Sequence, residues 1–221
     1  MKIEFEDVIK SAAPDLHVIT LSADVTNGPT SDELWNELEA EMERIAHTYQ
    51  LQEINSREGI RATRQAYKTL GKEPNRYRPS AEALSRRAVK GMGLYRVTTL
   101  VDLINLLSLW SGYSIGGFDH DKISGDTLRL GAGREGEDFE AIGRGQLNIA
   151  RMPIYRDEVG GIGTPTSDNE RTKLDPSTRR LLMVVNIYGR EPDDDKFINK
   201  AKELLTRYAA ARNIEVNHYN P

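Results

Sequence analysis

Hydrophobic and polar positions in the first half of the chain predict two short strands followed by helices. Residues 2–5 alternate between apolar and charged side chains, and residues 16–22 form a β-like run. Helical spacing then begins, because Ser31 is a good N-cap and apolar residues recur every three or four positions from there to Ile45. The N-terminal region therefore combines strands with at least one amphipathic helix.

Three more helices are predicted before residue 112. The first covers residues 56–70 and stops at Gly71, and the second covers residues 80–90 behind a proline-bracketed loop. The third, residues 99–110, is the most apolar and ends at Gly112, so we expect it to be buried.

Beyond Gly112 the pattern changes to short β-like segments separated by glycines. A last helix is predicted from Asp193 to Arg212, which leaves His218 in a frayed tail. Helices early and strands late indicate an α+β fold with mixed or antiparallel strands, not the alternation of a doubly wound sheet. The predicted strands cover residues 113–118, 127–130, 146–150, 154–155 and 181–188.

Composition narrows the class of protein. The 221 residues suffice for one large or two small domains, and 38% apolar with 29% charged residues is a globular balance. No apolar run approaches the roughly 20 residues that span a bilayer, so no membrane association is expected. The acidic start and the absence of cysteine favour a cytoplasmic protein.

The charge is distributed unevenly. Residues 61–96 hold ten basic and two acidic residues, a net charge of +8, which leaves −12 for the rest of a chain whose total is −4. The total argues against a general nucleic-acid or DNA binder, whereas the basic segment is either a solvated face or a surface that meets phosphates. Tyr67, Tyr77 and Tyr95 lie among its basic residues and favour the second interpretation. The candidate RNA-binding residues are Arg76, Arg78, Arg86 and Arg87.

Two catalytic signatures are rejected. Residues 131–136 fit G-x-G-x-x-G, but the following Glu137 and Asp138 would repel a pyrophosphate. Residues 112–116 fit G-x-S-x-G around Ser114, but a nucleophile elbow needs a strand before the serine and a helix after it, the reverse of the predicted order.

No metal or other cofactor is expected. The four histidines, His17, His47, His120 and His218, lie far apart in the sequence, and there is no cysteine. The acidic run at residues 193–195 is interpreted as the first turn of the last helix.

Two polar constellations are candidates for binding a ligand. Glu82 and Arg86 lie four residues apart on one helix face, an arrangement that an exposed ion pair would also explain. Ser167, Asp168 and Arg171 lie in a short loop whose groups suit the ammonium and carboxylate of a small ligand, although ordinary polar loops have similar compositions.

Several longer segments together resemble a known family. Residues 100–105 (LVDLIN), 116–125 (GGFDHDKISG) and 128–137 (LRLGAGREGE) resemble segments of the B3/B4 module of the phenylalanyl-tRNA synthetase beta chain. Residues 76–87 and 167–172 are similar to patterns in free-standing relatives. The resemblance covers roughly residues 64–190, and it implies a B3/B4-like domain at 64–221 with residues 1–63 as an extension packed on it.

In the synthetase this module hydrolyses tyrosine that is wrongly joined to the phenylalanine tRNA, in a pocket between its two halves. The resemblance therefore implies a pocket for an aminoacyl ester or amino acid. Asn105 keeps a family pocket residue, whereas Ile104 replaces threonine, Gly116 replaces histidine and Ile162 replaces glutamate.

The resulting expectation is a free-standing protein that binds the aminoacyl end of tRNA, needs no synthetase subunit, and either hydrolyses mischarged aminoacyl-tRNA in trans or does not. Alternatives are a non-catalytic module for RNA or a small amino-acid-like ligand, and a metabolic enzyme with a repurposed pocket. The candidate catalytic residues are Asn105, Ser167 and Asp168, and the candidate ligand-pocket residues are Gly116, Gly117, Phe118, Glu82, Arg86 and Arg171.

Overall fold

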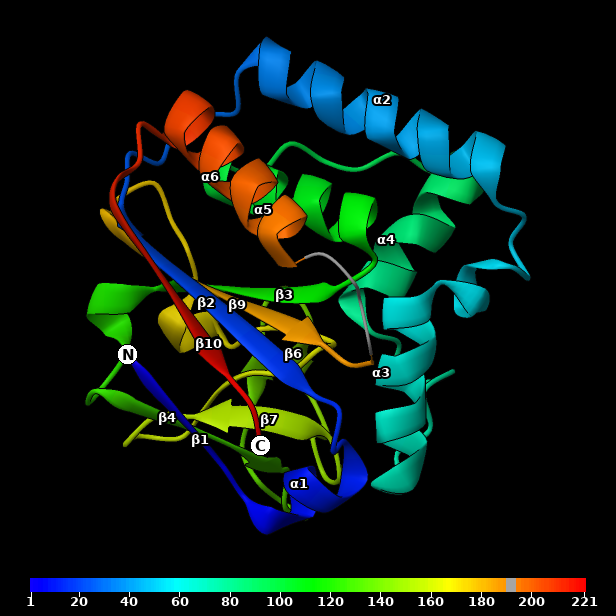
Figure 1. Ribbon diagram of the computed structural model, residues 1–221, viewed down its shortest axis with the longest axis vertical. Coiled ribbons are helices and arrows are strands. Elements are labelled where there is room, and N and C mark those ends of the chain that lie inside the picture. Colours follow the sequence, from blue (N-terminus) through cyan, green and yellow to red (C-terminus); the bar gives the residue numbers. More distant parts are fainter. Residues whose placement is uncertain (190–193) are drawn as a thin grey trace.

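The computed structural model describes residues 1–189 and 194–221, which form three layers (Figure 1). A layer of helices covers one face of a four-stranded sheet, and a second four-stranded sheet lies against the other face. The helices are α1 (Asp7–Ala12), α2 (Asp32–Thr48), α3 (Glu58–Thr69), α4 (Ser80–Val89), α5 (Thr99–Ser111) and α6 (Asp194–Ala209).

The central sheet has the strand order β10-β2-β9-β3 and is antiparallel throughout. The second sheet has the order β1-β4-β7-β8, in which only the pairing of β1 with β4 is parallel. The strands are β1 (Lys2–Phe5), β2 (His17–Asp24), β3 (Ser114–Asp119), β4 (Thr127–Ala132), β7 (Pro153–Arg156), β8 (Gly161–Gly163), β9 (Arg180–Ile187) and β10 (Arg212–Tyr219); β5 (Glu140–Ala141) and β6 (Gly145–Gln146) form a separate short hairpin.

Strand β9 is apolar along most of its length because it is buried on both faces. Leu181, Met183 and Val185 pack into the core beneath the helices, while Leu182 and Val184 pack into the core between the sheets. Such a central strand shows no polar face, which explains why its sequence gave the strongest strand signal in the chain.

The structure confirms the predicted α+β fold. The residues predicted to begin α2 and to end α5 do so in the structure. Ser31 Oγ accepts a hydrogen bond from the Leu34 amide at the start of α2, as the sequence predicts. Gly112 ends α5 with a φ of 81°, a conformation that glycine adopts without strain. The guanidinium of Arg57 donates to the carbonyls of Leu109 and Trp110, which the helix itself leaves unpaired.

The C-terminal prediction is wrong in part. Helix α6 ends at Ala209, and residues 212–219 form β10 along the edge of the central sheet, where a frayed tail was expected. Ile214 and Val216 alternate with polar residues and pack partly against the core, a period of two that identifies an edge strand. Asp193, the predicted first residue of the last helix, lies outside the described residues.

The first 63 residues, expected as an extension packed on the core, contribute strands to both sheets. Strand β1 pairs with β4, and β2 lies between β10 and β9 in the central sheet. Helix α1, a 3-10 turn at Ile54–Ser56 and β8 were not predicted, because each is short. No helix in residues 1–189 and 194–221 is long and apolar enough to cross a membrane.

Candidate functional site

A cavity of about 470 Å³ opens between α4, α5, β3 and the segment of residues 173–176. Its walls are mostly apolar, and its volume is in the range of small-molecule sites. The lining residues are Ser80, Leu84, Val97, Thr98, Val101, Ile104, Asn105, Ser108, Ile115, Gly117, Ile142, Asp168, Lys173, Leu174, Asp175 and Pro176.

Asp168 brings a carboxyl group to this apolar cavity. Its Oδ2 accepts a hydrogen bond of 3.1 Å from the Gly117 amide, whereas its Oδ1 receives none within the described part of the chain. Desolvation raises the pKa of Asp168 to about 7, and the Gly117 hydrogen bond opposes the rise only partly. Asp168 is half-buried and lines the cavity, and its Oδ1 lies beside Gly163 and Gly116, 2.8 and 3.4 Å from where a Cβ on each would be.

Polar groups on the helical wall are also available to a ligand. The Asn105 amide, on α5, has no hydrogen-bond partner among the described residues, and neither does the Ser80 hydroxyl. The Thr98 hydroxyl is buried and has no hydrogen-bond partner among the described residues. A buried hydroxyl without a partner costs free energy unless a ligand or water forms a hydrogen bond with it. These groups and Asp168 offer hydrogen bonds from different walls of the cavity.

The family-like segment 116–125 positions another wall. Lys122 Nζ donates to the Lys173 carbonyl at 2.9 Å and to Asp175 Oδ2 at 2.5 Å. Asp119 accepts from the Thr178 hydroxyl at 2.9 Å. These bonds hold residues 173–176 against β3, so the F-D-H-D-K-I segment shapes the cavity without lining it.

Two glycines in the middle of β3 allow side chains to pack closely on both faces of the strand. A Cβ on Gly117 would lie 2.4 Å from Ile104 Cδ1, and one on Gly116 would lie 2.7 Å from the Phe118 ring. Of the three predicted pocket residues on this strand, only Gly117 lines the cavity; Gly116 and Phe118 pack on the other side of β3.

Glu82 and Arg86 form an internal ion cluster outside the cavity lining. Glu82 is fully buried, and its carboxylate receives Arg64 Nη1 and Arg86 Nε, each at 2.8 Å, with Arg78 Nε at 3.7 Å. Arg86 also donates to Asn55 at 3.0 Å. Two guanidiniums hydrogen-bonded to one buried carboxylate are engaged with the protein, so their arrangement serves to hold α3 and α4 together.

Arg171 and Ser167 also lie outside the cavity lining. Arg171 binds Asp157 through two hydrogen bonds of 2.8 and 3.0 Å. Burial alone would raise the pKa of Asp157, but the hydrogen bonds from Arg171 and from backbone N–H groups lower it. The backbone of Ser167 joins a turn with Thr164, and this turn presents Asp168 to the cavity.

The four candidate RNA-binding arginines differ in accessibility. Arg76 and Arg78 are exposed, whereas Arg86 and Arg87 are half-buried, with Arg87 Nε bonded to the Gly93 carbonyl at 3.0 Å. Arg78 Nε lies 3.7 Å from Glu82 Oε1, and Arg76 lies over the Tyr77 ring. Their role in RNA binding stays a prediction.

Several cavity residues were missed by sequence reasoning. Thr98, Ser108 and Lys173 carry no motif, and the apolar residues of the walls look like ordinary core residues in the sequence. The two rejected signatures do not belong to the cavity: Ser114 lies buried in β3 directly after α5, and Gly131 lies in β4.

The fold and the cavity define the class: a two-sheet α+β domain that encloses a mostly apolar cavity lined in part by the Asp168 carboxyl. The chain belongs to the B3/4 domain family, whose family model matches residues 62–208.

Two curated relatives are phenylalanine–tRNA ligase beta subunits. The one from Bartonella henselae is 33% identical over 100 residues, and the one from Bartonella quintana is 34% identical over 100 residues. Each match covers 44% of this chain and only 12% of the relative. A solved N-terminal fragment of the phenylalanyl-tRNA synthetase beta subunit from Pyrococcus horikoshii aligns with 97% of this chain and 50% of its own, at 13% identity and a TM-score of 0.47.

Proposed function

We propose that this chain binds the aminoacyl end of a tRNA in the cavity beside Asp168. Family membership supports the proposal, because curated proteins similar to this chain are beta subunits of a tRNA ligase. The cavity volume of about 470 Å³ is sufficient for an amino acid with its ester-linked ribose, and the exposed Arg76 and Arg78, on the loop before α4, suit the phosphates that follow.

Different residues of the cavity walls contact different parts of the ligand. The Asp168 carboxyl group binds the α-ammonium group of the amino acid, because it lines the cavity and accepts a single hydrogen bond from the described residues. Ile104, Ile115 and Leu174 contact an apolar amino-acid side chain, and the Asn105 amide orients the ester carbonyl. The single observation that carries the proposal is the Asp168 carboxyl in a mostly apolar cavity.

Binding to a panel of aminoacyl-tRNAs, correctly charged and mischarged, tests the proposal. Each is compared with the same uncharged tRNA at constant salt concentration. The expected result is that the amino acid strengthens binding, and that Asp168→Asn removes this gain while binding to uncharged tRNA is unchanged. Ser114→Ala is the matched control, because Ser114 is buried outside the cavity lining. Equal affinity for charged and uncharged tRNA would refute an aminoacyl pocket.

Hydrolysis of the ester is a second candidate, supported by the pKa of about 7 for Asp168. A base with that pKa is well matched to a neutral medium. In this reaction ionised Asp168 takes a proton from water, the hydroxide adds to the ester carbonyl, and the proton passes to the departing ribose oxygen. Asp168 cannot hold the ammonium in that complex, so the two roles exclude each other for a given ligand.

The release of amino acid from mischarged tRNA distinguishes the candidates. A hydrolase should release it faster as the pH rises from 6 to 8, because the base must be ionised, and Asp168→Asn should slow the release at least a hundredfold. Binding that depends on the amino acid, without any release, identifies a non-catalytic module.

A further inference from the structure

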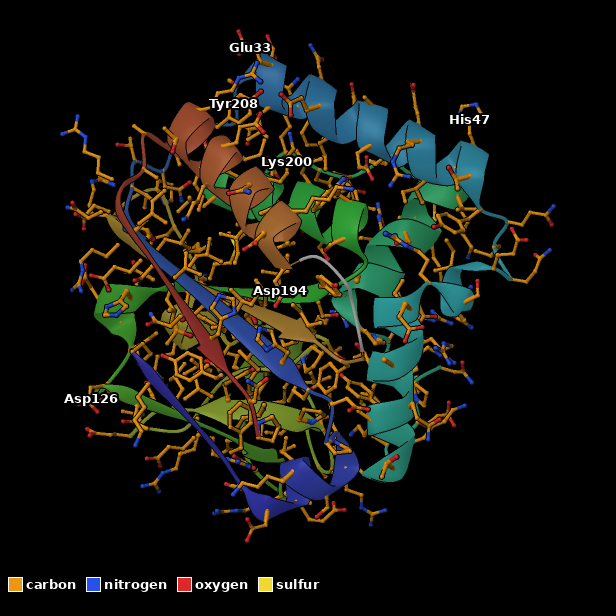
Figure 2. The ribbon with its side chains drawn as sticks, viewed as in Figure 1. Glu33, His47, Asp126, Asp194, Lys200 and Tyr208 are labelled. Atoms are coloured by element: carbon orange, nitrogen blue, oxygen red, sulfur yellow. The ribbon has the colours of Figure 1, made fainter. Side chains whose placement is uncertain are left out.

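Two histidines and one carboxylate meet at the edge of the central sheet formed by β10. His17 Nε2 lies 3.0 Å from His218 Nδ1 and 3.0 Å from Asp194 Oδ2, and the last two atoms are 4.0 Å apart. Asp194 is the first residue of α6 and lies at the end of that helix nearest the sheet (Figure 2). None of the three residues lines the cavity beside Asp168.

The fold explains why residues so distant in sequence meet. Strand β10 runs antiparallel to β2 with His218 opposite Ile19, so His17 and His218 are diagonal neighbours on one face of the sheet. Ile19 belongs to the core beneath the helices, and this is the face that α6 covers. The beginning of α6 therefore brings Asp194 to the two rings.

A hydrogen bond fixes the orientation of the His17 ring. His17 Nδ1 lies 2.8 Å from the Asn220 amide oxygen, which can only accept, so Nδ1 carries the proton. In neutral His17 the lone pair is then on Nε2, and it faces a ring nitrogen and a carboxylate oxygen. An acceptor that fixes the other ring nitrogen is the usual arrangement for a histidine that ligates a metal.

We propose that His17, His218 and Asp194 bind one divalent transition-metal ion. The three distances place a point about 2.0 Å from all three ligand atoms, within the range of bonds from zinc-like ions to imidazole and carboxylate. Two imidazoles favour zinc, nickel, cobalt or copper over magnesium and calcium, which prefer oxygen.

The surroundings fit a metal that joins elements of the fold. The side chains of His17, Asp194 and His218 are 22, 33 and 45% exposed, so water can complete the coordination. The ion would fix the C-terminal strand and the start of α6 to β2 and so stabilise the sheet edge. This site is independent of the aminoacyl pocket, and failure of either proposal leaves the other intact.

Titration of the untagged, chelator-treated full chain with Co²⁺, and separately with Ni²⁺ and Zn²⁺, tests the site by calorimetry. We expect one ion per chain, with affinity at least 100-fold weaker in His17→Ala and in His218→Ala. Asn220→Ala should weaken binding about 10- to 100-fold through the ring orientation. His47→Ala is the control, because His47 is exposed on α2 (Figure 2) and should leave the affinity unchanged.

Thermal unfolding gives a second readout. With metal about 100-fold above its Kd, the midpoint of the unmodified protein should rise by roughly 5 to 10 °C, and that of His218→Ala should not. Asp194→Asn is a conservative variant that keeps the shape of the side chain. Circular dichroism of each variant without metal verifies that the variant folds. The absence of saturable binding, or equal binding by the unmodified protein and a folded His218→Ala variant, would overturn the proposal.

Discussion

The hydroxyl of Tyr155 on β7 donates a hydrogen bond of 2.7 Å to Asn186 Oδ1 on β9, in the buried space between the two sheets. Asn186 Nδ2 in turn donates to the Ser114 carbonyl on β3 at 3.0 Å. Desolvation raises the pKa of Tyr155, so its hydroxyl keeps the proton that this bond needs. Tyr155 and Asn186 thereby connect the second sheet to the sheet that carries the cavity.

Tyr155→Phe should lower the free energy of unfolding by about 1 to 3 kcal/mol, because it leaves Asn186 Oδ1 buried without a donor. Urea denaturation measures the change. Tyr95→Phe is the matched control, since Tyr95 is 80% exposed and its hydroxyl is not expected to contribute. Equal midpoints for the two variants would mean that water replaces the lost donor.

Glu82→Gln should destabilise the fold by about 3 to 5 kcal/mol, because two hydrogen-bonded guanidiniums, from Arg64 and Arg86, lose their common buried carboxylate. Glu203→Gln, in which the pair of Glu203 with Lys200 is exposed on α6, should change stability by less than about 1 kcal/mol. Chemical denaturation at constant pH compares them. A loss below about 1 kcal/mol for Glu82→Gln would show that the cluster is not a main support of α3 and α4.

The stability of the protein should depend on the ionisation of Asp168. Its pKa is raised to about 7 in the folded state from an ordinary value of 3.8, so folding favours the protonated form. The folded state then binds more protons than the unfolded state, and stability falls as the pH rises from about 4 to 7.

Asp168→Asn removes this dependence. The free energy of unfolding of Asp168→Asn, relative to that of the unmodified protein, should therefore increase between pH 4 and 7. The increase is up to about 4 kcal/mol for a pKa that folding raises from 3.8 to about 7. Urea denaturation at several pH values measures the difference. A difference that does not vary with pH would contradict a raised pKa at Asp168.

Gly117→Ala should close part of the cavity. The new Cβ would lie 2.4 Å from Ile104 Cδ1 and 3.0 Å from Leu174 Cδ1, so these side chains must move, and the space for a ligand changes. We expect the contribution of the amino acid to aminoacyl-tRNA binding to fall at least tenfold in a binding titration. Gly28→Ala, whose Cβ would meet nothing within 4 Å, should bind normally. Unchanged binding in Gly117→Ala would place the ligand elsewhere.

Replacing Arg76 and Arg78 together by alanine should weaken tRNA binding and reduce the slope of log affinity against log salt by about 1 to 2. Both side chains are exposed on the loop that precedes α4, whose first residue, Ser80, lines the cavity. The matched control replaces Lys202 and Arg212, which are exposed on α6 and β10 and should have little effect. If both double variants lower binding equally, the effect is one of net charge and not of a specific surface.

The candidate site was only partly predictable. Asn105, Gly117 and Asp168 come together at the cavity, and all three were named from the sequence. Glu82 and Arg86, named for the same pocket, instead pair with each other in an internal cluster. Spacing showed that these two side chains share a helix face, but spacing does not specify whether that face meets a ligand, solvent or another helix.

The sequence by itself determined the features that depend on neighbours within a few residues: the Ser31 cap, the stop at Gly112, the buried strand β9 and the segments that carry the B3/4 family. Only the tertiary structure decided that residues 212–219 pair with β2, which places His218 3.0 Å from His17 across 201 positions of sequence. Helix caps and period-two burial are local, whereas strand partners and the desolvation of Asp168 depend on elements that only folding brings together.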